Sequence, residues 1–181
     1  MAIVVNLFGT PGAGKSTGAA FVFSQLKMQG INCELVTEFA KDKVWENTQE
    51  VFKNQAYIFG KQSFKISRCA EKVDVIITDS PLPLSIFYNN DPRLTENFNQ
   101  SVMDFFNSYH NMNFLLTRTK PYNPVGRHQT EEEADKLAEP MIQLLESRDI
   151  PYTEVKGEFE GYVMIKDLVM EELRNGKKNT P

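Results

Sequence analysis

The sequence predicts an α/β protein built on a doubly wound, parallel five-stranded sheet flanked by helices. Two observations predict this class. Short apolar runs alternate with longer amphipathic segments along the 181 residues, which is typical of a parallel sheet covered by helices on both faces. The first apolar run also leads directly into a glycine-rich loop and then a helical segment, a strand–loop–helix unit common in such sheets.

The strands are expected at apolar runs bounded by glycines or turn residues. These runs span residues 2–8, 33–37, 75–78, 114–117 and 152–155. Helices are expected at residues 16–29, 48–73, 96–109, from 130 onward, and at 162–174. In the longest helix, Phe52, Ala56, Phe59 and Ile66 fall on one predicted buried face. Thr130 and Glu133 have the spacing of a capping box at the start of their helix.

Composition and length indicate one globular domain over residues 1–175, with a tail at 176–181 that we expect to fray. Hydrophobic residues make up 41% and charged residues 24% of the chain. No apolar run is long enough to span a membrane, so we expect no membrane partner. The net charge of −4 argues against an extensive basic surface. Cys33 and Cys69 lack metal-ligand spacing, and a cytoplasmic location is the simplest interpretation.

The glycine-rich loop matches the phosphate-binding pattern G-x-x-x-x-G-K-[ST] in full. Its residues are Gly9, Thr10, Pro11, Gly12, Ala13, Gly14, Lys15, Ser16 and Thr17. Glycines let successive backbone N–H groups surround a phosphate, and the next helix presents its N-terminus to the same anion. Lys15 is suited to the β- and γ-phosphates of ATP, and the Ser16 hydroxyl is suited to Mg²⁺. A chance glycine turn would lack the strand and helix expected on either side.

Asp79 directly follows the third predicted strand, so it lies at the carboxyl edge of the sheet beside the phosphate loop. There it is suited to hold a magnesium-bound water or to act on the acceptor. The alternative is an ordinary helix N-cap, helped by Ser80 and Pro81.

Several features favour a kinase over other phosphate-loop proteins. The chain has no room for a motor or effector module, and the Asn-Lys-x-Asp signature of GTP recognition does not follow the fourth strand. Residues 118–129 instead predict a lid, in which Arg118 and Arg127 neutralise the transferring phosphoryl group and help to exclude water. A solvated basic loop is the alternative for this segment. An ATP-binding or ATPase regulatory module without an acceptor is the alternative for the whole chain.

Over residues 3–146 the sequence resembles the small P-loop kinases of the thymidylate kinase and deoxyribonucleoside kinase type, particularly the compact bacteriophage versions. It is also similar to nicotinamide riboside kinases. The residues that carry the resemblance, besides the phosphate loop, are Glu38, Gln55, Tyr57, Asp79 and the Arg118/Arg127 lid. The deoxyribonucleoside kinases follow strand three with Glu-Arg-Ser and the thymidylate kinases with Asp-Arg, whereas this chain has Asp79-Ser80-Pro81. This is a departure from both families, and the lid is the candidate to take over the task of the missing arginine.

The resemblance implies that Glu38 is the base for an accepting hydroxyl and that Gln55 reads the nucleobase, with Trp45 or Tyr57 near the acceptor. An N-cap for Glu38, an ordinary polar position for Gln55 and simple packing for both aromatic residues are the alternatives. The implied acceptor is a nucleoside or nucleotide such as a deoxynucleoside monophosphate. The hydroxymethyl group of 5-hydroxymethyldeoxyuridine in phage DNA, within the host cytoplasm, and nicotinamide riboside are further candidates. Dimers are common in these families, which makes a homodimer a candidate assembly.

A basic stripe at helical spacing bears on the acceptor. Its members are Lys61, Lys65, Arg68 and Lys72. Such a stripe is either the solvated face of an amphipathic helix or a surface that follows the phosphates of a polynucleotide.

Overall fold

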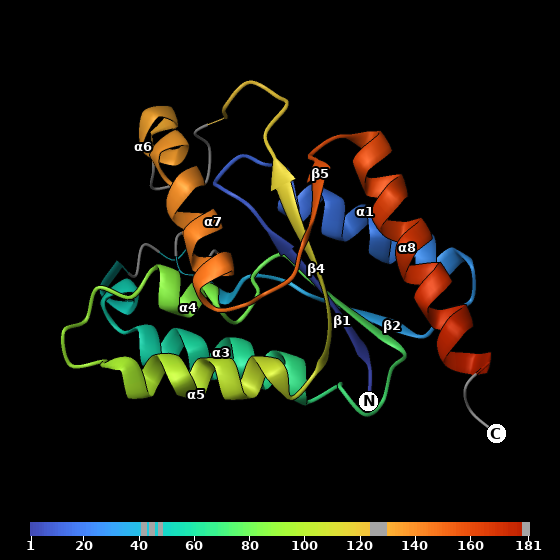
Figure 1. Cartoon of the computed structure of the whole chain (residues 1–181), viewed down its shortest axis with the longest axis horizontal. Coiled ribbons are helices and arrows are strands. Elements are labelled where there is room, and N and C mark those ends of the chain that lie inside the picture. The colour runs from blue at the N-terminus through green and yellow to red at the C-terminus, as the bar shows by residue number, and fades with distance from the viewer. Residues whose placement is uncertain (41–42, 44–45, 47–48, 124–129, 179–181) are drawn as a thin grey trace.

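The computed structural model describes residues 1–40, 43, 46, 49–123 and 130–178. A central sheet separates two helical layers (Figure 1). On one face lie α1 and α8, and on the other lie α3, α4, α5 and α7. This three-layer arrangement confirms the predicted doubly wound α/β class.

The sheet has five parallel strands in the order β2-β3-β1-β4-β5. They are β1 (Ile3–Phe8), β2 (Cys33–Val36), β3 (Val75–Thr78), β4 (His110–Thr117) and β5 (Thr153–Lys156). The predicted strand over residues 114–117 begins too late, because β4 starts at His110. Its first half is polar, and Asn6 of β1 donates from its side-chain amide to the amide oxygens of Asn111 and Asn113, at 2.9 and 3.0 Å. This buried amide network replaces the apolar pattern from which a strand is normally predicted.

The helices follow the predicted order with some changes of boundary. They are α1 (Lys15–Met28), α3 (Gln55–Ser67), α4 (Leu84–Phe87), α5 (Glu96–Asn107), α6 (Glu131–Lys136), α7 (Ala138–Ser147) and α8 (Phe159–Lys178), with a 3₁₀ helix η1 at Gln49–Lys53. The short α4 was not predicted. The capping box of Thr130 and Glu133 is confirmed. The helix that it opens ends at Lys136, since Pro140 has no N–H to donate to the carbonyl of that residue.

The prediction of one helix over residues 48–73 is wrong. Asn54 interrupts it, and its side chain accepts a hydrogen bond from the N–H of Tyr57 at 3.0 Å to cap the start of α3. The buried face of α3 is correspondingly different from the expected one, because Ala56 is exposed while Gln55 and Gln62 are buried. Ile66 is buried as predicted.

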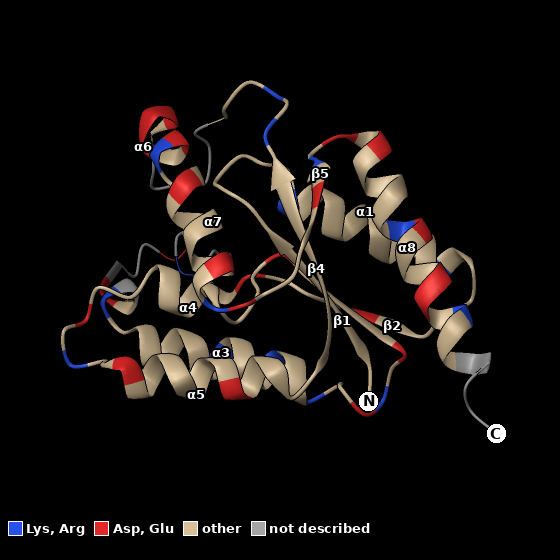
Figure 2. Ribbon diagram, viewed as in Figure 1, with Lys and Arg blue, Asp and Glu red and all other residues tan. Residues whose placement is uncertain are grey.

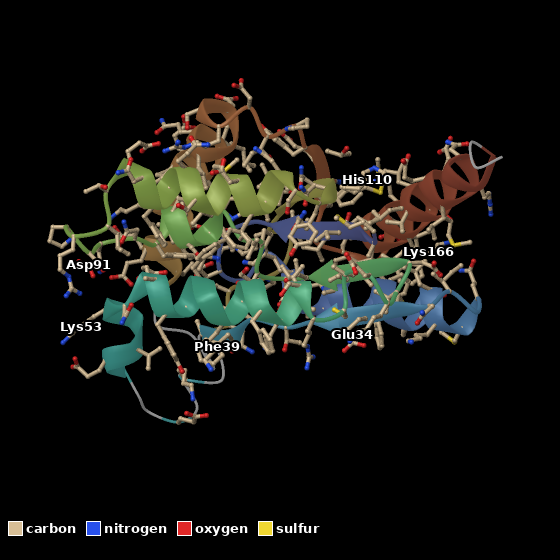
Figure 3. The ribbon with its side chains drawn as sticks, turned by 90° about the horizontal axis from the view of Figure 1, so that it is seen from below. Glu34, Phe39, Lys53, Asp91, His110 and Lys166 are labelled. Carbon is tan, nitrogen blue, oxygen red and sulfur yellow. The ribbon has the colours of Figure 1, made fainter. Side chains whose placement is uncertain are left out.

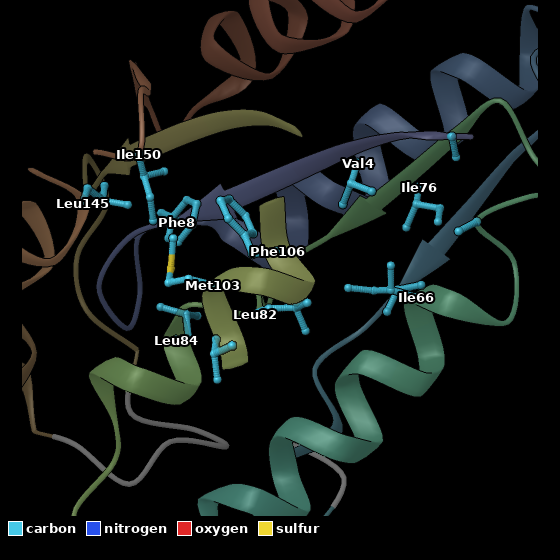
Figure 4. Packing of buried hydrophobic residues seen from close by; sticks show 14 of the residues in the cluster. Val4, Phe8, Ile66, Ile76, Leu82, Leu84, Met103, Phe106, Leu145 and Ile150 are labelled. Carbon is cyan, nitrogen blue, oxygen red and sulfur yellow. The ribbon is translucent and has the colours of Figure 1, made fainter. Parts of the chain in front are cut away.

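Alternate residues of β1 pack on opposite faces of the sheet, as a pleated strand requires. Val5 and Leu7 contact the layer of α1 and α8. Val4 and Phe8 belong to the other cluster, which also contains Ile66, Leu82 and Phe106 (Figure 4). Both faces are therefore buried, and the parallel strands bring their carboxyl ends together at one edge of the sheet.

The last helix is longer than predicted. Helix α8 continues to Lys178, four residues beyond the predicted end at Arg174, and residues 179–181 lie outside the described part. None of the helices in the described ranges is long and apolar enough to cross a membrane.

An ion pair joins α7 to α5 and makes stability depend on pH. The Arg148 guanidinium, directly after α7, donates to both carboxylate oxygens of Glu96 at 2.5 and 3.1 Å. The hydrogen bonds from Arg148, and then one from Asn99, lower the pKa of Glu96 from 4.5 to about 2. Because the folded pKa is depressed, the stabilisation is present above pH 4.5 and is lost as the pH falls toward 2.

We therefore expect Arg148→Met to lower the free energy of unfolding near pH 7 and to have progressively less effect between pH 4.5 and 2. Chemical denaturation at a series of pH values measures this difference. Glu96→Gln is the matched control, because it removes the same ion pair by neutralising the carboxylate instead of the guanidinium. A difference between wild type and Arg148→Met that is equal at pH 3 and pH 7 would contradict the assignment.

Candidate functional site

The phosphate loop leaves β1 in a conformation that only glycine adopts easily. Gly9, Gly12 and Gly14 have φ angles of 142°, 87° and 91°, in the region that side chains disfavour. A Cβ on Gly9 would also lie 2.7 Å from the carbonyl oxygen of Leu116. Helix α1 begins at Lys15, within the motif, so its N-terminus faces the phosphate loop. The loop and the start of α1 therefore have the backbone conformation expected of a phosphate-binding loop.

The polar side chains of the loop lie at the start of α1. The Lys15 ammonium donates to the carbonyl oxygens of Gly9 and Thr10, at 2.7 and 3.1 Å. Ser16 and Thr17 are exposed in the first turn. The hydroxyl of Ser16 and the carboxylate of Asp79 are hard oxygen donors, which suits Mg²⁺ held together with substrate phosphates.

The phosphate loop is supported from behind by the connection between β5 and α8. The N–H of Gly157 donates to the carbonyl of Thr117 at 2.8 Å. The Tyr162 hydroxyl lies 3.1 Å from the carbonyl oxygen of Gly14 and 3.0 Å from that of Gly157. A Cβ on Gly157 would approach the carbonyl oxygen of Ala13 to 1.9 Å. Sequence reasoning missed this support, although two glycines close after the last strand were a signal of close packing.

Glu38 and Asp79 meet at the carboxyl edge of the sheet. The backbone N–H of Glu38 donates to Oδ1 of Asp79 at 2.9 Å. The register explains this contact, because Val36 of β2 pairs with Thr78 of β3 and both strands end at that pair. Asp79 is only 4% exposed. Its carboxylate thus binds the neighbouring turn, and it is not the N-cap of α4, which is Pro83.

Tyr88 adds a neutral hydroxyl near this pair. It ends α4, and its half-buried ring packs edge-on against Phe87 at 4.8 Å between centroids. Burial, and secondly the negative charge of Glu38, raise the pKa of Tyr88 to about 12. The hydroxyl therefore stays protonated at neutral pH and is able to donate a hydrogen bond. No motif in the sequence points to Tyr88.

The residues predicted to contact an acceptor lie on or near α3. Gln55 is buried in its first turn. Tyr57 is 42% exposed, and its ring packs against Phe39 at 5.6 Å, with the Lys61 ammonium 5.5 Å from the ring centroid. Packing thus accounts for Tyr57, while its exposed part remains able to contact a ligand. Trp45 lies outside the described residues.

The lid segment begins close over the phosphate loop. The side chains of Arg118 and Tyr122 would lie 3.4 and 3.0 Å from a Cβ on Gly12, and the guanidinium is 5.4 Å from the Tyr122 ring centroid. Arg118 also pairs with Asp135 and, at 3.3 Å, with Glu131. Its side chain is only 16% exposed, so it is a packed residue and not a solvated one. Arg127 lies outside the described residues.

The helix beside the lid is acidic. Figure 2 shows this concentration of carboxylates on α6, whose acidic residues are Glu131, Glu132, Glu133 and Asp135. Two of them pair with Arg118 and one pairs with Lys136 at 2.8 Å. The predicted basic character of the lid therefore does not extend into α6.

The basic stripe does not form one continuous helical face. Helix α3 ends at Ser67, so Arg68 caps it and Lys72 lies beyond it. The Lys65 ammonium donates to the carbonyl of Thr37 at 2.8 Å, and Arg68 lies 3.9 Å from the carboxylate of Glu34. Phe39 and Glu34 lie alongside α3 in Figure 3. Lys65 is thus bound to the turn after β2, and Arg68 is paired with β2 itself.

Comparison with known proteins agrees with this geometry. A family model described as an AAA domain matches residues 4–161. The chain belongs to this family. No curated protein matches it.

Solved structures of nucleoside and nucleotide kinases share the fold. A thymidylate kinase from Ehrlichia chaffeensis aligns with a TM-score of 0.60 and 13% identity over 95% of this chain and 98% of its own. A deoxyadenosine kinase from M. mycoides aligns with a TM-score of 0.53 in two structures. One, with the products dCMP and dCDP bound, is 20% identical over 95% of this chain and 99% of its own. The other, with dATP bound, is 21% identical over 94% and 99%. The resemblance to small P-loop nucleoside and nucleotide kinases is confirmed at the level of the fold.

The contact between Tyr162 and Gly14 leads to a prediction about nucleotide binding. Tyr162→Phe keeps the ring but leaves the carbonyls of Gly14 and Gly157 without the hydroxyl. We expect a loss of about 1 kcal/mol in the free energy of unfolding and an approximately fivefold weaker affinity for ATP, because the loop is less firmly held. Chemical denaturation and calorimetric titration measure the two effects. Tyr152→Phe is the matched control, and equal ATP affinities for the two variants would show that the hydroxyl does not support the loop.

Proposed function

We propose that this protein is an ATP-dependent kinase that transfers the γ-phosphoryl group to a hydroxyl of a nucleoside-type acceptor. One observation carries the proposal: the backbone of Glu38 is hydrogen-bonded to the carboxylate of Asp79 at the sheet edge where the phosphate loop also opens. Two acidic residues next to an anion cradle suit a reaction that joins an acceptor hydroxyl to a phosphate.

The donor side follows from the loop. Backbone N–H groups of the phosphate loop, other than Pro11, and the N-terminus of α1 hold the phosphates, and Lys15 exchanges its loop carbonyls for phosphate oxygens. Ser16 and Asp79 would hold Mg²⁺, which when bound offsets the negative charge of the phosphates. Arg118, already placed over Gly12, contributes a further cation at the lid.

The acceptor side is assigned to Glu38. Its carboxylate orients the acceptor hydroxyl and takes the proton as the oxygen attacks the γ-phosphorus, while the bond from that phosphorus to the β–γ bridging oxygen breaks and ADP leaves. Oδ1 of Asp79 accepts the amide N–H of Glu38 and Asp79 is assigned to Mg²⁺, so the proposal gives proton acceptance to the glutamate carboxylate. Contacts with the rest of the acceptor are assigned to Gln55, Tyr57 and the protonated hydroxyl of Tyr88.

The charge distribution supports a small acceptor over a base within DNA. Two of the described cations are paired with carboxylates, Arg93 with Asp91 at 2.7 Å and Lys53 with Glu50 at 2.8 Å, and the Lys61 ammonium lies over the Tyr57 ring. Lys53 and Asp91 lie at the same end of the molecule in Figure 3. A surface that binds a polynucleotide instead presents cations that exchange counterions for phosphates. A free nucleoside or nucleotide therefore fits better than hydroxymethyldeoxyuridine in duplex DNA.

Replacing the proposed base tests the chemistry. Glu38→Gln keeps the shape and the backbone hydrogen bond but removes the proton acceptor, so we expect the transfer rate to fall by about 10²- to 10⁴-fold with ATP affinity unchanged. Steady-state kinetics and ATP titration measure both quantities. Glu34→Gln, in the same segment but paired with Arg68 at 3.9 Å, is the matched control. An unchanged rate in Glu38→Gln would eliminate Glu38 as the base.

A panel of acceptors with γ-labelled ATP identifies the substrate. It contains deoxynucleosides, their monophosphates, nicotinamide riboside, and DNA with and without hydroxymethyluracil. A kinase shows ADP release that depends on one of these acceptors, and Lys15→Ala abolishes it. Equal ADP release with and without every acceptor would instead identify an ATPase module.

A further inference from the structure

We infer that Gln62 of α3 is a positioning residue that holds the turn at residues 37–39 in place and thereby aims the carboxylate of Glu38 at the acceptor. This inference rests on the proposed kinase function, in which Glu38 is the base. Gln62 carries no recognisable motif, and it is one of the few polar side chains that are almost fully buried, at 2% exposure.

Three consecutive residues of the turn are each held through the backbone by a side chain from another element. The Thr37 carbonyl accepts a hydrogen bond from Lys65 at 2.8 Å. The Glu38 N–H donates to Asp79 at 2.9 Å. The Phe39 N–H donates to Oε1 of Gln62 at 3.1 Å. Helix α3 and the end of β3 therefore hold the turn from two sides.

The other half of the Gln62 amide extends this connection to β3. Its Nε2 donates to Oγ1 of Thr78 at 3.3 Å, and the same oxygen accepts the Ser80 N–H at 3.1 Å. Asp79 lies between Thr78 and Ser80, so one buried amide links the turn that carries Glu38 to the turn that carries Asp79. Both polar ends of Gln62 are engaged within the protein, which makes it a structural contact and not a reader of the acceptor.

The position of the turn explains why such a contact is needed. Strand β2 is at the edge of the sheet and pairs only with β3, and it ends at Val36, so sheet hydrogen bonds do not define the conformation of the next residues. A base that is misplaced by about 1 Å loses much of its effect. Gln62 is buried and approaches from a helix, so it holds the turn more rigidly than an exposed side chain would.

The Phe39 side chain adds an apolar contact to the same turn. Its ring packs edge-on against that of Tyr57, which precedes Gln62 in α3, at 5.6 Å between centroids. Two residues of α3 thus hold Phe39: Tyr57 contacts its ring, and Gln62 accepts its backbone N–H. Loss of the Gln62 hydrogen bond therefore frees the backbone while this ring contact keeps the segment near its place, so the expected defect is one of alignment and not of folding.

The test uses Gln62→Leu, which removes both hydrogen bonds with little change of volume. Ile66→Val, one helical turn away and buried at 1%, is the matched control for a general loss of packing. Thr78→Val is a second variant that removes the partner of Nε2 and leaves Gln62 itself intact. Amide hydrogen exchange of the segment with Glu38 and Phe39 is measured alongside steady-state kinetics with the acceptor found in the panel.

In Gln62→Leu we expect exchange in this segment to become about 2- to 10-fold faster, as the loss of one hydrogen bond predicts, with exchange in β1 unchanged. We expect kcat for transfer to fall about tenfold or more, a part of the whole effect of a general base. The affinity for ATP and the acceptor-independent hydrolysis of ATP stay the same. Thr78→Val changes both quantities in the same direction by a smaller factor, and Ile66→Val changes neither.

The outcomes that overturn the inference are distinct from failure of the proposed function. Unchanged exchange at Glu38 and Phe39 would show that Gln62 does not hold the turn. Faster exchange with kcat equal to that of Ile66→Val would show that the turn does not position the base. If the wild-type protein transfers phosphate to no acceptor, the kinase proposal and the positioning role fail together, while the exchange measurement still decides whether Gln62 holds the turn.

Discussion

The hydrogen bond from the Glu38 amide to Asp79 is the contact on which the arrangement of the site depends. A carboxylate that is 4% exposed needs a donor, and the parallel sheet supplies one because β2 and β3 end at the same level. The two acidic residues, 41 positions apart in sequence, are thereby fixed beside each other. The phosphate loop opens from β1, the next strand of the sheet, so donor and acceptor sides share one edge.

The two sides of the site are held by different means. The phosphate loop is fixed mainly by steric constraints: the positive φ angles of its glycines, the close approach of Gly157 to Ala13, and the Tyr162 ring under Gly14 and Gly18. The acceptor side is fixed by side-chain hydrogen bonds to a short turn. Steric fixation tolerates little sequence variation, whereas a hydrogen-bonded turn accepts other side chains of similar reach. This difference explains why a motif identifies the donor and no motif identifies the acceptor.

The parts that could be predicted from sequence are those encoded in local patterns. The third strand, the phosphate loop and the capping box at Thr130 each depend on a few adjacent residues, and the structure has them where they were expected. The start of β4 was missed because its asparagines pair across strands and hide the apolar pattern. The long helix was overextended because the Asn54 cap resembles any polar helix position in sequence. Gln62 was overlooked for the same reason, since its burial and both of its partners are set by distant segments.

Charge pairing connects the fold to the choice of acceptor. Arg118, Arg93 and Arg148 each have a carboxylate partner within the protein, and Lys65 is bound to the Thr37 carbonyl. A ligand that binds through long-range attraction to phosphates would have to compete with these internal partners. The small acceptor that we propose does not, because it would be recognised by short-range contacts with Glu38, Gln55 and Tyr88. Among these arginines of the described residues, Arg118 lies over Gly12 of the phosphate loop, so phosphates bound there would compete with its carboxylate partners for the same guanidinium.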